Sequence, residues 1–190
     1  MSTREELAGV TCPLCGGEIY QESFRCGTCG DQHNKTSLEM LRARQTPLLM
    51  LTWEALRRGY TQWGPSIESI LSPTGRMRQW IQEMNSPCQP HQHDGFAILA
   101  YTPYFGHPNS KLVGVGMAVQ WRTFPPPRDD WDYGVFVVPE YRRRGYGTRI
   151  TVAATQIVTA TGEKFRIHPH NVESVRFYES LGKGRAGVTT

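Results

Sequence analysis

The chain lacks the long apolar segments of secreted and membrane-spanning proteins. Its longest clearly apolar stretch is Pro47-Leu-Leu-Met-Leu51, far below the roughly 20 residues that cross a bilayer. The first residues, Met1-Ser-Thr-Arg-Glu-Glu6, are charged and contain no apolar core of the kind that secretory signals carry. Hydrophobic residues make up 38% of the 190 residues and charged residues 20%, which is typical of a folded globular protein. We therefore expect a cytoplasmic protein without a membrane partner.

Cysteine is scarce, and its spacing is unlike that of a disulfide framework. Four of the five cysteines form two pairs, Cys12-Pro-Leu-Cys15 and Cys26-Gly-Thr-Cys29, and Cys88 stands alone. In a reducing compartment this spacing indicates a metal site, because two tight turns supply the four thiolates that zinc prefers in a closed tetrahedral site. A thioredoxin-like redox pair is not favoured, since no βαβ pattern surrounds the cysteines. His33 could replace one ligand, but four cysteines already complete the set.

Residues 1–33 resemble a zinc ribbon and have too few apolar residues to fold without such a staple. Two arginines against five acidic residues give this segment a charge of −3, so the remainder carries +7 of the total of +4. The segment contains no lysine, and contacts to nucleic-acid phosphates need lysine and arginine. We expect it to recruit a protein or to be purely structural; nucleic acid is not the favoured partner.

The rest of the chain alternates between helical and strand patterns. The stretch Gln45–Thr52 fits either a strand or a helix. Asn171 is a plausible cap for the last helix. The predicted helices cover about 38–41, 53–58, 73–84, 148–161 and 172–181, and the predicted strands cover 95–101, 112–121, 133–138 and 164–168.

The most informative stretch is Val135-Phe-Val-Val-Pro-Glu-Tyr-Arg-Arg-Arg-Gly-Tyr-Gly-Thr148. An apolar strand enters a turn whose glycines expose backbone N–H groups, and a helix begins directly after it. Free N–H groups at the positive end of a helix dipole suit a pyrophosphate. Arg142, Arg143, Arg144 and Arg149 add positive charge. The alternative is a solvated, arginine-rich surface turn.

A second motif, Asn171-x-x-Ser174-x-x-Phe177-Tyr178-x-x-x-Gly182, follows the next predicted strand. Its named positions are spaced close to multiples of a helical turn and so lie broadly along one side of a helix. Together with Arg142-Arg-Arg-Gly145-Tyr-Gly147, it resembles motifs A and B of the GNAT superfamily of N-acetyltransferases. The resemblance covers about residues 95–182.

This resemblance implies an α/β (α+β) fold: a GNAT-type mixed sheet flanked by helices in residues 34–190, preceded by the small zinc ribbon. It implies acetyl-CoA as cosubstrate, beside a structural Zn²⁺ in the ribbon. Two departures stand out. Lys183 replaces the aromatic residue that usually follows the motif glycine, and only eight residues follow Gly182, too few for the usual two last strands. Either the sheet is truncated, or another segment or the second subunit of a homodimer completes it.

The resemblance also implies which residues hold the cosubstrate. The backbone of Val135, Phe136 and Val137 would pair with the pantetheine arm as though it were an extra strand. Asn171 would contact the cosubstrate near its pantetheine portion. The N–H groups that would cradle the pyrophosphate belong to Arg143, Arg144, Gly145, Tyr146, Gly147 and Thr148.

For the chemistry, the resemblance places Tyr178 near the thioester sulfur as proton donor to the leaving thiolate; the alternative is a core aromatic residue. A backbone N–H of Phe136 or Val137 would stabilise the oxyanion. A base must take the proton of the attacking amine. Asp132 lies close to where histone-type members place a glutamate, but many members use a water chain, and a solvated loop carboxylate is the alternative.

The acceptor is expected to be a primary amine on a protein, a peptide or a cationic small molecule, because Asp129, Asp130 and Asp132 precede the strand on the acceptor side. Two other functions remain open. One is a CoA-binding or CoA-less interaction module recruited through its ribbon. The other is acetylation of an RNA-linked amine, which the +7 charge permits and the acidic loop opposes. The pairs His91-Gln-His93 and His168-Pro-His170 are expected to be exposed polar residues and not a second metal site.

Overall fold

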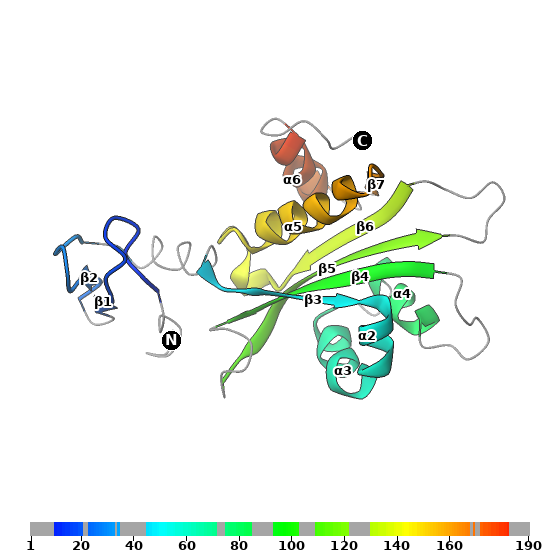
Figure 1. Cartoon of the computed structure of the whole chain (residues 1–190), viewed down its shortest axis with the longest axis horizontal. Coiled ribbons are helices and arrows are strands. Elements are labelled where there is room, and N and C mark those ends of the chain that lie inside the picture. Colours follow the sequence, from blue (N-terminus) through cyan, green and yellow to red (C-terminus); the bar gives the residue numbers. More distant parts are fainter. Residues whose placement is uncertain are drawn as a thin grey trace.

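The computed structural model describes residues 10–20, 23–32, 34, 45–71, 75–84, 93–102, 109–121, 130–167, 169 and 172–182. Near the N-terminus, β1 (Ile19–Tyr20) and β2 (Arg25–Cys26) pair antiparallel in a two-stranded sheet. All other described strands belong to one five-stranded sheet (Figure 1).

The five-stranded sheet follows the chain from one edge to the other. Its strands are β3 (Leu48–Thr52), β4 (His93–Thr102), β5 (Lys111–Trp121), β6 (Asp130–Val137) and β7 (Lys164–Ile167). Strands β3 to β6 pair antiparallel with their neighbours, whereas β7 lies parallel to β6. The mixed sheet implied by the sequence is therefore confirmed.

Helices cover both faces of this sheet (Figure 1). One face carries α2 (Trp53–Arg58), α3 (Tyr60–Ile70) and α4 (Arg76–Met84), and the other carries α5 (Tyr146–Ala160) and α6 (Val172–Gly182). No helix among the described residues is long and apolar enough to cross a membrane.

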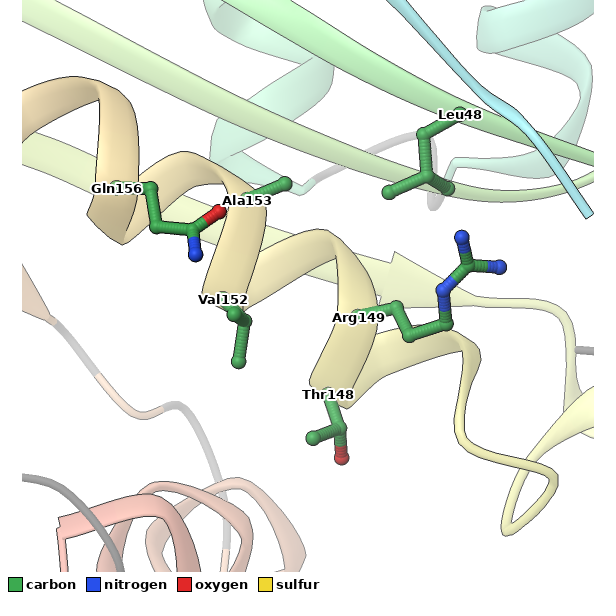
Figure 2. A pocket seen from close by; sticks show the side chains of 6 residues that line it. All are labelled: Leu48, Thr148, Arg149, Val152, Ala153 and Gln156. Carbon is green, nitrogen blue, oxygen red and sulfur yellow. The ribbon is translucent and has the colours of Figure 1, made fainter. Parts of the chain in front are cut away.

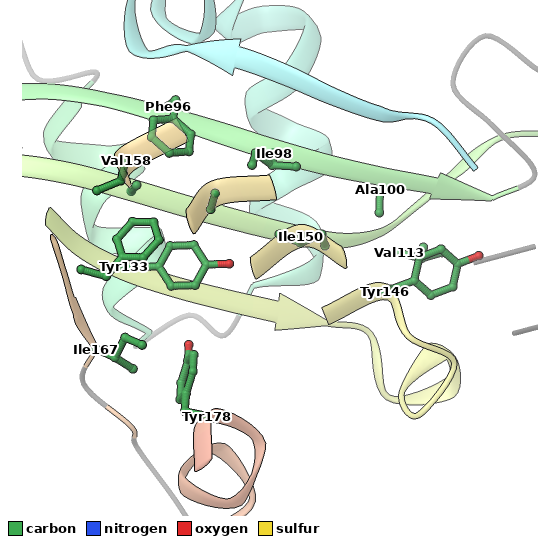
Figure 3. Packing of buried hydrophobic residues seen from close by; sticks show 13 residues of the cluster. Phe96, Ile98, Ala100, Val113, Tyr133, Tyr146, Ile150, Val158, Ile167 and Tyr178 are labelled. Carbon is green, nitrogen blue, oxygen red and sulfur yellow. The ribbon is translucent and has the colours of Figure 1, made fainter. Parts of the chain in front are cut away.

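The two-residue repeat of a strand divides the apolar residues between two cores. On β4, Phe96 and Ile98 pack in the cluster between the sheet and helices α5 and α6. Ala97 and Leu99 pack in the cluster on the other face, between the sheet and helices α2, α3 and α4. The same division holds on β6, where odd-numbered residues face α5 and even-numbered residues face α4. Figure 3 shows the first of these clusters.

Helix α3 is the main element that the sequence did not predict. Gly64 and Pro65 lie inside it, and both residue types oppose a helix interior. Tertiary packing outweighs that local preference, because Ile67 is fully buried against the sheet. Gly64 has a packing reason as well: a Cβ atom there would lie 2.4 Å from the ring of Tyr60.

The other predicted elements are close to those observed. Helix α2 has the expected bounds, and the ambiguous stretch before it forms β3. Helix α4 begins at Arg76, three residues later than expected. The predicted helix at 38–41 and the chain after Gly182 lie outside the described residues.

Candidate functional site

The turn between β6 and α5 has the backbone conformation that its glycine requires. A short 3₁₀ helix, Pro139–Tyr141, follows β6, and Gly145 then forms the N-cap of α5 with a φ of 94°. This left-handed conformation costs little for glycine and is strained for other residues. Arg143 also has a positive φ, of 60°. The chain therefore turns sharply enough to aim the start of α5 at the end of β6.

Helix α5 begins with backbone donors, and its N-cap residue, Gly145, has no side chain to cap them. The first complete intrahelical hydrogen bond runs from Arg149 N–H to Gly145 C=O, at 3.1 Å. The N–H groups of Tyr146, Gly147 and Thr148 belong to the first turn, whose donors have no helical acceptor. Together with the positive end of the helix dipole, they form a site suited to an anion.

Arg142 extends from this turn toward α6. Its Nε donates to the carbonyl of Val137 at 3.1 Å, and its Nη1 lies 3.6 Å from a carboxylate oxygen of Glu173 on α6. The guanidinium also lies over the ring of Phe136. Arg144 lies over the ring of Tyr141, at 5.1 Å from its centroid. Positive charge is thus fixed around the turn by contacts that the sequence alone did not specify.

Arg149 is directed away from the turn, contrary to its expected place among the charges there. Its Nη1 donates to the carbonyl of Thr46 at 2.6 Å, and partial burial lowers the pKa of its guanidinium. Figure 2 shows this side chain beside Leu48, at a hollow of about 340 Å³ between β3 and α5. The remaining lining residues of the hollow all come from α5, and they are Thr148, Val152, Ala153 and Gln156.

Strands β6 and β7 separate partway along β6. Their parallel register runs from Asp130, opposite Lys164, to Tyr133, opposite Ile167, where β7 ends. Beyond this point β6 continues to Val137, paired only with β5 among the described residues. The backbone between Gly134 and Val137 therefore has one edge without a strand partner in the described part of the chain, and this edge leads directly into the turn before α5.

Tyr178 of α6 lies beside this edge. Its side chain is buried in the cluster below α5 and points from α6 toward the sheet (Figure 3). Burial raises the pKa of Tyr178 to about 12, although a hydrogen bond with the backbone of Val135 acts in the opposite direction. Its hydroxyl group is therefore close to the edge of β6 and stays protonated at ordinary pH.

A second buried phenol, Tyr133, lies on the same face of β6. Its hydroxyl donates to Thr151 Oγ1 of α5 at 3.0 Å. Burial raises the pKa of Tyr133 well above its usual value, and the nearby Tyr178 adds to that effect. Tyr133 could not be recognised as a site residue from the sequence, because an aromatic residue on an apolar strand indicates only a core position.

Asp132 lies on the opposite face of β6 and is buried. Its Oδ2 accepts a hydrogen bond from Nη2 of Arg76 at 3.4 Å, and its exposed fraction is only 3%. The alternative that Asp132 is a solvated loop carboxylate is therefore wrong. The side chain of Asp132 projects from one face of β6, whereas Tyr178 lies against the other face. A molecule that contacted both side chains would therefore have to reach both faces of β6.

Residues of α4 line the same face of β6 as Asp132. A Cβ atom at Gly134 would lie 3.0 Å from Cγ of Met77 and 3.7 Å from the ring of Trp80. Helix α4 thus packs closely against β6 at the point where β6 loses its partner strand. A side chain at position 134 would therefore require the flexible side chain of Met77 to shift.

The four N-terminal cysteines converge. Their Sγ atoms all lie within 4.8 Å of one another, with Cys12 to Cys29 at 3.7 Å and Cys15 to Cys26 at 3.4 Å. A tetrahedral zinc with Zn–S bonds of about 2.3 Å needs sulfur atoms about 3.8 Å apart, so the cluster fits this ion. A disulfide needs about 2.05 Å, and all four cysteines are free.

Backbone N–H groups point at the sulfur atoms of this cluster. Gly17 N–H donates to Cys15 Sγ and Thr28 N–H to Cys26 Sγ, both at 3.4 Å. A backbone hydrogen bond from Cys29 is the largest cause that lowers the pKa of Cys26, to about 6. These contacts favour the thiolate of Cys26, the form of cysteine that binds metals. At Cys29 a backbone hydrogen bond with Asp31 acts in the same direction, but side-chain hydrogen bonds with Cys15 and Cys26 outweigh it and raise the pKa of Cys29 to about 12.

Several predicted residues lie outside the described part of the chain. Among them is Asn171, so its predicted contact with the cosubstrate stays a prediction. The others are His33, Cys88, His91, Asp129, His168, His170 and Lys183; for Asp130 and His93 the backbone is described, but not the side chain.

The acetyltransferase (GNAT) family matches residues 66–183, more than half of the chain. No curated protein matches.

Among solved structures, the chain is similar to smu.2055 from Streptococcus mutans UA159, with 20% identity, a TM-score of 0.48, and coverage of 72% of this chain and 82% of that one. It is also similar to AAC(6')-Iy in complex with the bisubstrate analog CoA-S-monomethyl-acetylneamine, with 14% identity, a TM-score of 0.46, and coverage of 76% and 96%. A third is the spermidine/spermine N-acetyltransferase SpeG from Vibrio cholerae, with 14% identity, a TM-score of 0.45, and coverage of 71% and 76%. Likenesses at these values name no acceptor for this chain.

Proposed function

This chain belongs to the acetyltransferase (GNAT) family and is an acetyl-CoA-dependent N-acetyltransferase, and we propose that its acceptor is a primary amine on a protein, a peptide or a cationic small molecule. The observation that carries the proposal is the unpaired edge of β6 from Gly134 to Val137, which leads to the open N-terminus of α5 and has Tyr178 beside it.

The proposed binding mode uses backbone groups more than side chains. The free edge at Val135, Phe136 and Val137 offers donors and acceptors at the spacing of a strand, which suits the amide groups of a pantetheine arm. Val137 C=O is already bonded to Arg142 and the backbone of Val135 to Tyr178, so an arm that pairs along this edge would share or replace these bonds. Asn171 is proposed to contact the arm as well. The donors proposed for the pyrophosphate are the N–H groups of Arg143, Arg144, Gly145, Tyr146, Gly147 and Thr148.

The proposed reaction is direct acyl transfer. The amine nitrogen forms a bond to the thioester carbon, the carbon–sulfur bond breaks, and the electron pair leaves with sulfur. A backbone N–H of Phe136 or Val137 would stabilise the oxyanion, and Tyr178 would donate to the departing sulfur. Asp132 would take the proton from the amine, directly or through water, because an ammonium cannot attack.

The N-terminal cysteine cluster is proposed to be a zinc ribbon. Cys12, Cys15, Cys26 and Cys29 would hold the ion, and its role would be structural because four thiolates leave no open position. Very few apolar residues pack with the cluster, which supports a module that needs metal to fold. We propose residues 1–33 as this ribbon and 34–190 as the acetyltransferase domain.

The proposal is tested by following the acetyl group. The purified protein is incubated with isotope-labelled acetyl-CoA and a mixture of peptides, polyamines and aminoacylated tRNA, and mass spectrometry identifies which species gain label. Label on the primary amines of peptides or small amines is the expected result.

Two other results would replace the proposal. Tight binding of acetyl-CoA without label on any amine would favour a CoA-binding module that acts through its ribbon. Label confined to the RNA-linked amine, with an affinity that falls steeply as salt rises, would favour the RNA alternative.

A further inference from the structure

Under the proposed function, the thioester sulfur lies beside Tyr178, and this leaves one face of β6 for the acceptor amine. Tyr178 reaches β6 from the face that α5 and α6 cover, and this face also holds the buried pair Tyr133 and Thr151. The face left for an acceptor is the one that carries α4 and Asp132. Which acceptors can approach β6 therefore depends on the groups that α4 presents there.

Arg76, the first residue of α4, is one of the charged groups at this place, and Arg166 of β7 lies opposite Asp132 in the strand register. Its Nη2 lies 3.4 Å from Oδ2 of Asp132, and its guanidinium carbon lies 5.8 Å from the ring centroid of Trp80. Trp80 and Asp132 are both buried. A buried carboxylate on one side and a buried aromatic ring on the other hold the guanidinium in a defined place, because cations are attracted to the faces of aromatic rings.

The ion pair presents its positive end outward. The side chain of Arg76 is 37% exposed, whereas that of Asp132 is 3% exposed. Among the described residues, Asp132 is the only hydrogen-bond partner of Arg76. A guanidinium has five N–H donors in a planar fork that matches a carboxylate. Most of these donors therefore have no acceptor within the described part of the chain, and the partly exposed guanidinium can offer them to an acceptor substrate.

We propose that Arg76 selects acceptors whose amine has a carboxylate nearby, such as an amine within an acidic peptide segment. The inference rests on the proposed function and narrows it. The anchored guanidinium would bind the carboxylate of the acceptor and bring the amine to β6. The same positive charge would repel a polyamine, which offers cations only. Acidic peptides are therefore the substrate class, and polyamine-like molecules are not.

Matched peptides test this selection without knowledge of the natural acceptor. A library of short, C-terminally amidated peptides has one lysine, a free N-terminus and varied flanking residues. Each member is made in two versions that differ only by aspartate or asparagine beside the lysine. Spermidine is added as the polycationic probe. Competition for labelled acetyl-CoA then gives relative kcat/KM values for the wild type, Arg76→Lys and Arg76→Gln.

For the wild type we expect the aspartate versions to be labelled about tenfold faster than their asparagine twins, since the contact is charge-assisted but partly exposed. The preference should shrink in Arg76→Lys, which keeps the charge but loses the fork, and vanish in Arg76→Gln. In the wild type it should also weaken at 0.5 M salt, because salt screens exposed charges. That salt measurement needs no variant and so does not depend on the folding of Arg76→Gln.

Equal labelling of the aspartate and asparagine versions by the wild type would overturn the inference. So would spermidine that outcompetes every peptide, or a preference for aspartate that Arg76→Gln retains. In each of these cases amines are still acetylated, so the proposed function survives. If acetyl-CoA binds and no amine gains label, the proposed function fails, and the inference fails with it.

Discussion

Burial raises the pKa of Tyr178 to about 12, whereas a cysteine-like thiol has a pKa of about 8.5. Complete proton transfer from this phenol to a free thiolate would therefore be uphill by roughly 5 kcal/mol. The hydroxyl can still donate a hydrogen bond to the sulfur while negative charge develops there. At the residue scale, Tyr178 is thus better suited to stabilise the departing thiolate than to protonate it fully before it leaves.

We expect Tyr178→Phe to lower kcat by about two orders of magnitude and to leave acetyl-CoA affinity nearly unchanged, because removing one fixed hydrogen-bond donor to developing negative charge typically costs about 10²–10³-fold. The ring that packs below α5 is kept, so the melting temperature should hardly move. Because its pKa is raised, the phenol stays protonated as pH rises, and no loss of activity below pH 10 should trace to Tyr178. A fully active Tyr178→Phe enzyme, with Tyr178→Ala destabilised, would leave only the core-aromatic role.

The Asp132→Asn substitution distinguishes a catalytic base from a residue that only holds Arg76 in place. The substitution keeps the shape of the side chain and removes the carboxylate that would accept the amine proton. We expect kcat to fall by about 10² while Kd for acetyl-CoA stays the same. Arg76→Lys is the matched control, since it changes the other half of the ion pair. Normal kcat for Asp132→Asn at saturating acceptor would show that water, and not Asp132, takes the proton.

At the scale of elements, α5 approaches β5 so closely that the residue of β5 at the contact, Gly116, must be glycine. A Cβ atom at Gly116 would lie 2.3 Å from Cγ2 of Ile150 and 3.0 Å from the hydroxyl of Tyr133. This contact fixes the height of α5 above the sheet. It thereby also fixes the height of the turn that aims N–H groups at the end of β6.

We expect Gly116→Ala to lower the free energy of unfolding by about 1–3 kcal/mol, the usual cost of overpacking a core. Urea unfolding measures the loss. Gly134→Ala is the control, because the nearest atoms there belong to the flexible side chain of Met77, and it should cost less. Equal stability of Gly116→Ala and the wild type would mean that α5 packs less closely than described.

The elements that position the site were largely predictable, since local patterns determine them. The strand before the turn, the glycine at its N-cap and the helix after it all follow from period-two and helical spacing and from the conformational needs of Gly145. Helix α3 was not predictable, because Gly64 and Pro65 oppose a helix and only tertiary packing of Ile67 overrides them. The contacts of Arg76 and Arg149 were not predictable either, because each joins residues more than 50 positions apart.

At the scale of the whole molecule, the cysteine module and the sheet are joined by a specific contact. The side-chain amide of Gln45 both accepts from Thr11 N–H and donates to Thr11 C=O, each at 3.0 Å. The next residue, Thr46, is buried and accepts the hydrogen bond of Arg149 on α5. Within the described residues, the module therefore contacts the chain just before β3.

We expect about one zinc per chain, measured by elemental mass spectrometry of the purified protein. Cys26→Ser should release the metal and unfold the module, while acetyl-CoA binding persists, because the acetyltransferase sheet has its own two cores. Thr28→Ser, at a neighbouring exposed position without a thiol, is the control. Wild-type protein that holds no metal and still protects residues 10–30 from proteolysis would contradict the zinc assignment.

The central claim is that the turn at Gly145 binds the pyrophosphate of acetyl-CoA, and calorimetric titration with acetyl-CoA tests it most directly. Gly145 and Gly162 both have a positive φ, of 94° and 79°, and at neither would a Cβ atom meet anything within 4 Å. Glutamate at either position therefore brings similar backbone strain and the same charge, but only position 145 is at the proposed phosphate site. We expect Gly145→Glu to weaken acetyl-CoA binding at least 100-fold and Gly162→Glu to keep Kd within about threefold of the wild type, since phosphate groups and a carboxylate repel each other at close range. Wild-type affinity in Gly145→Glu would contradict the assignment of this turn to the pyrophosphate.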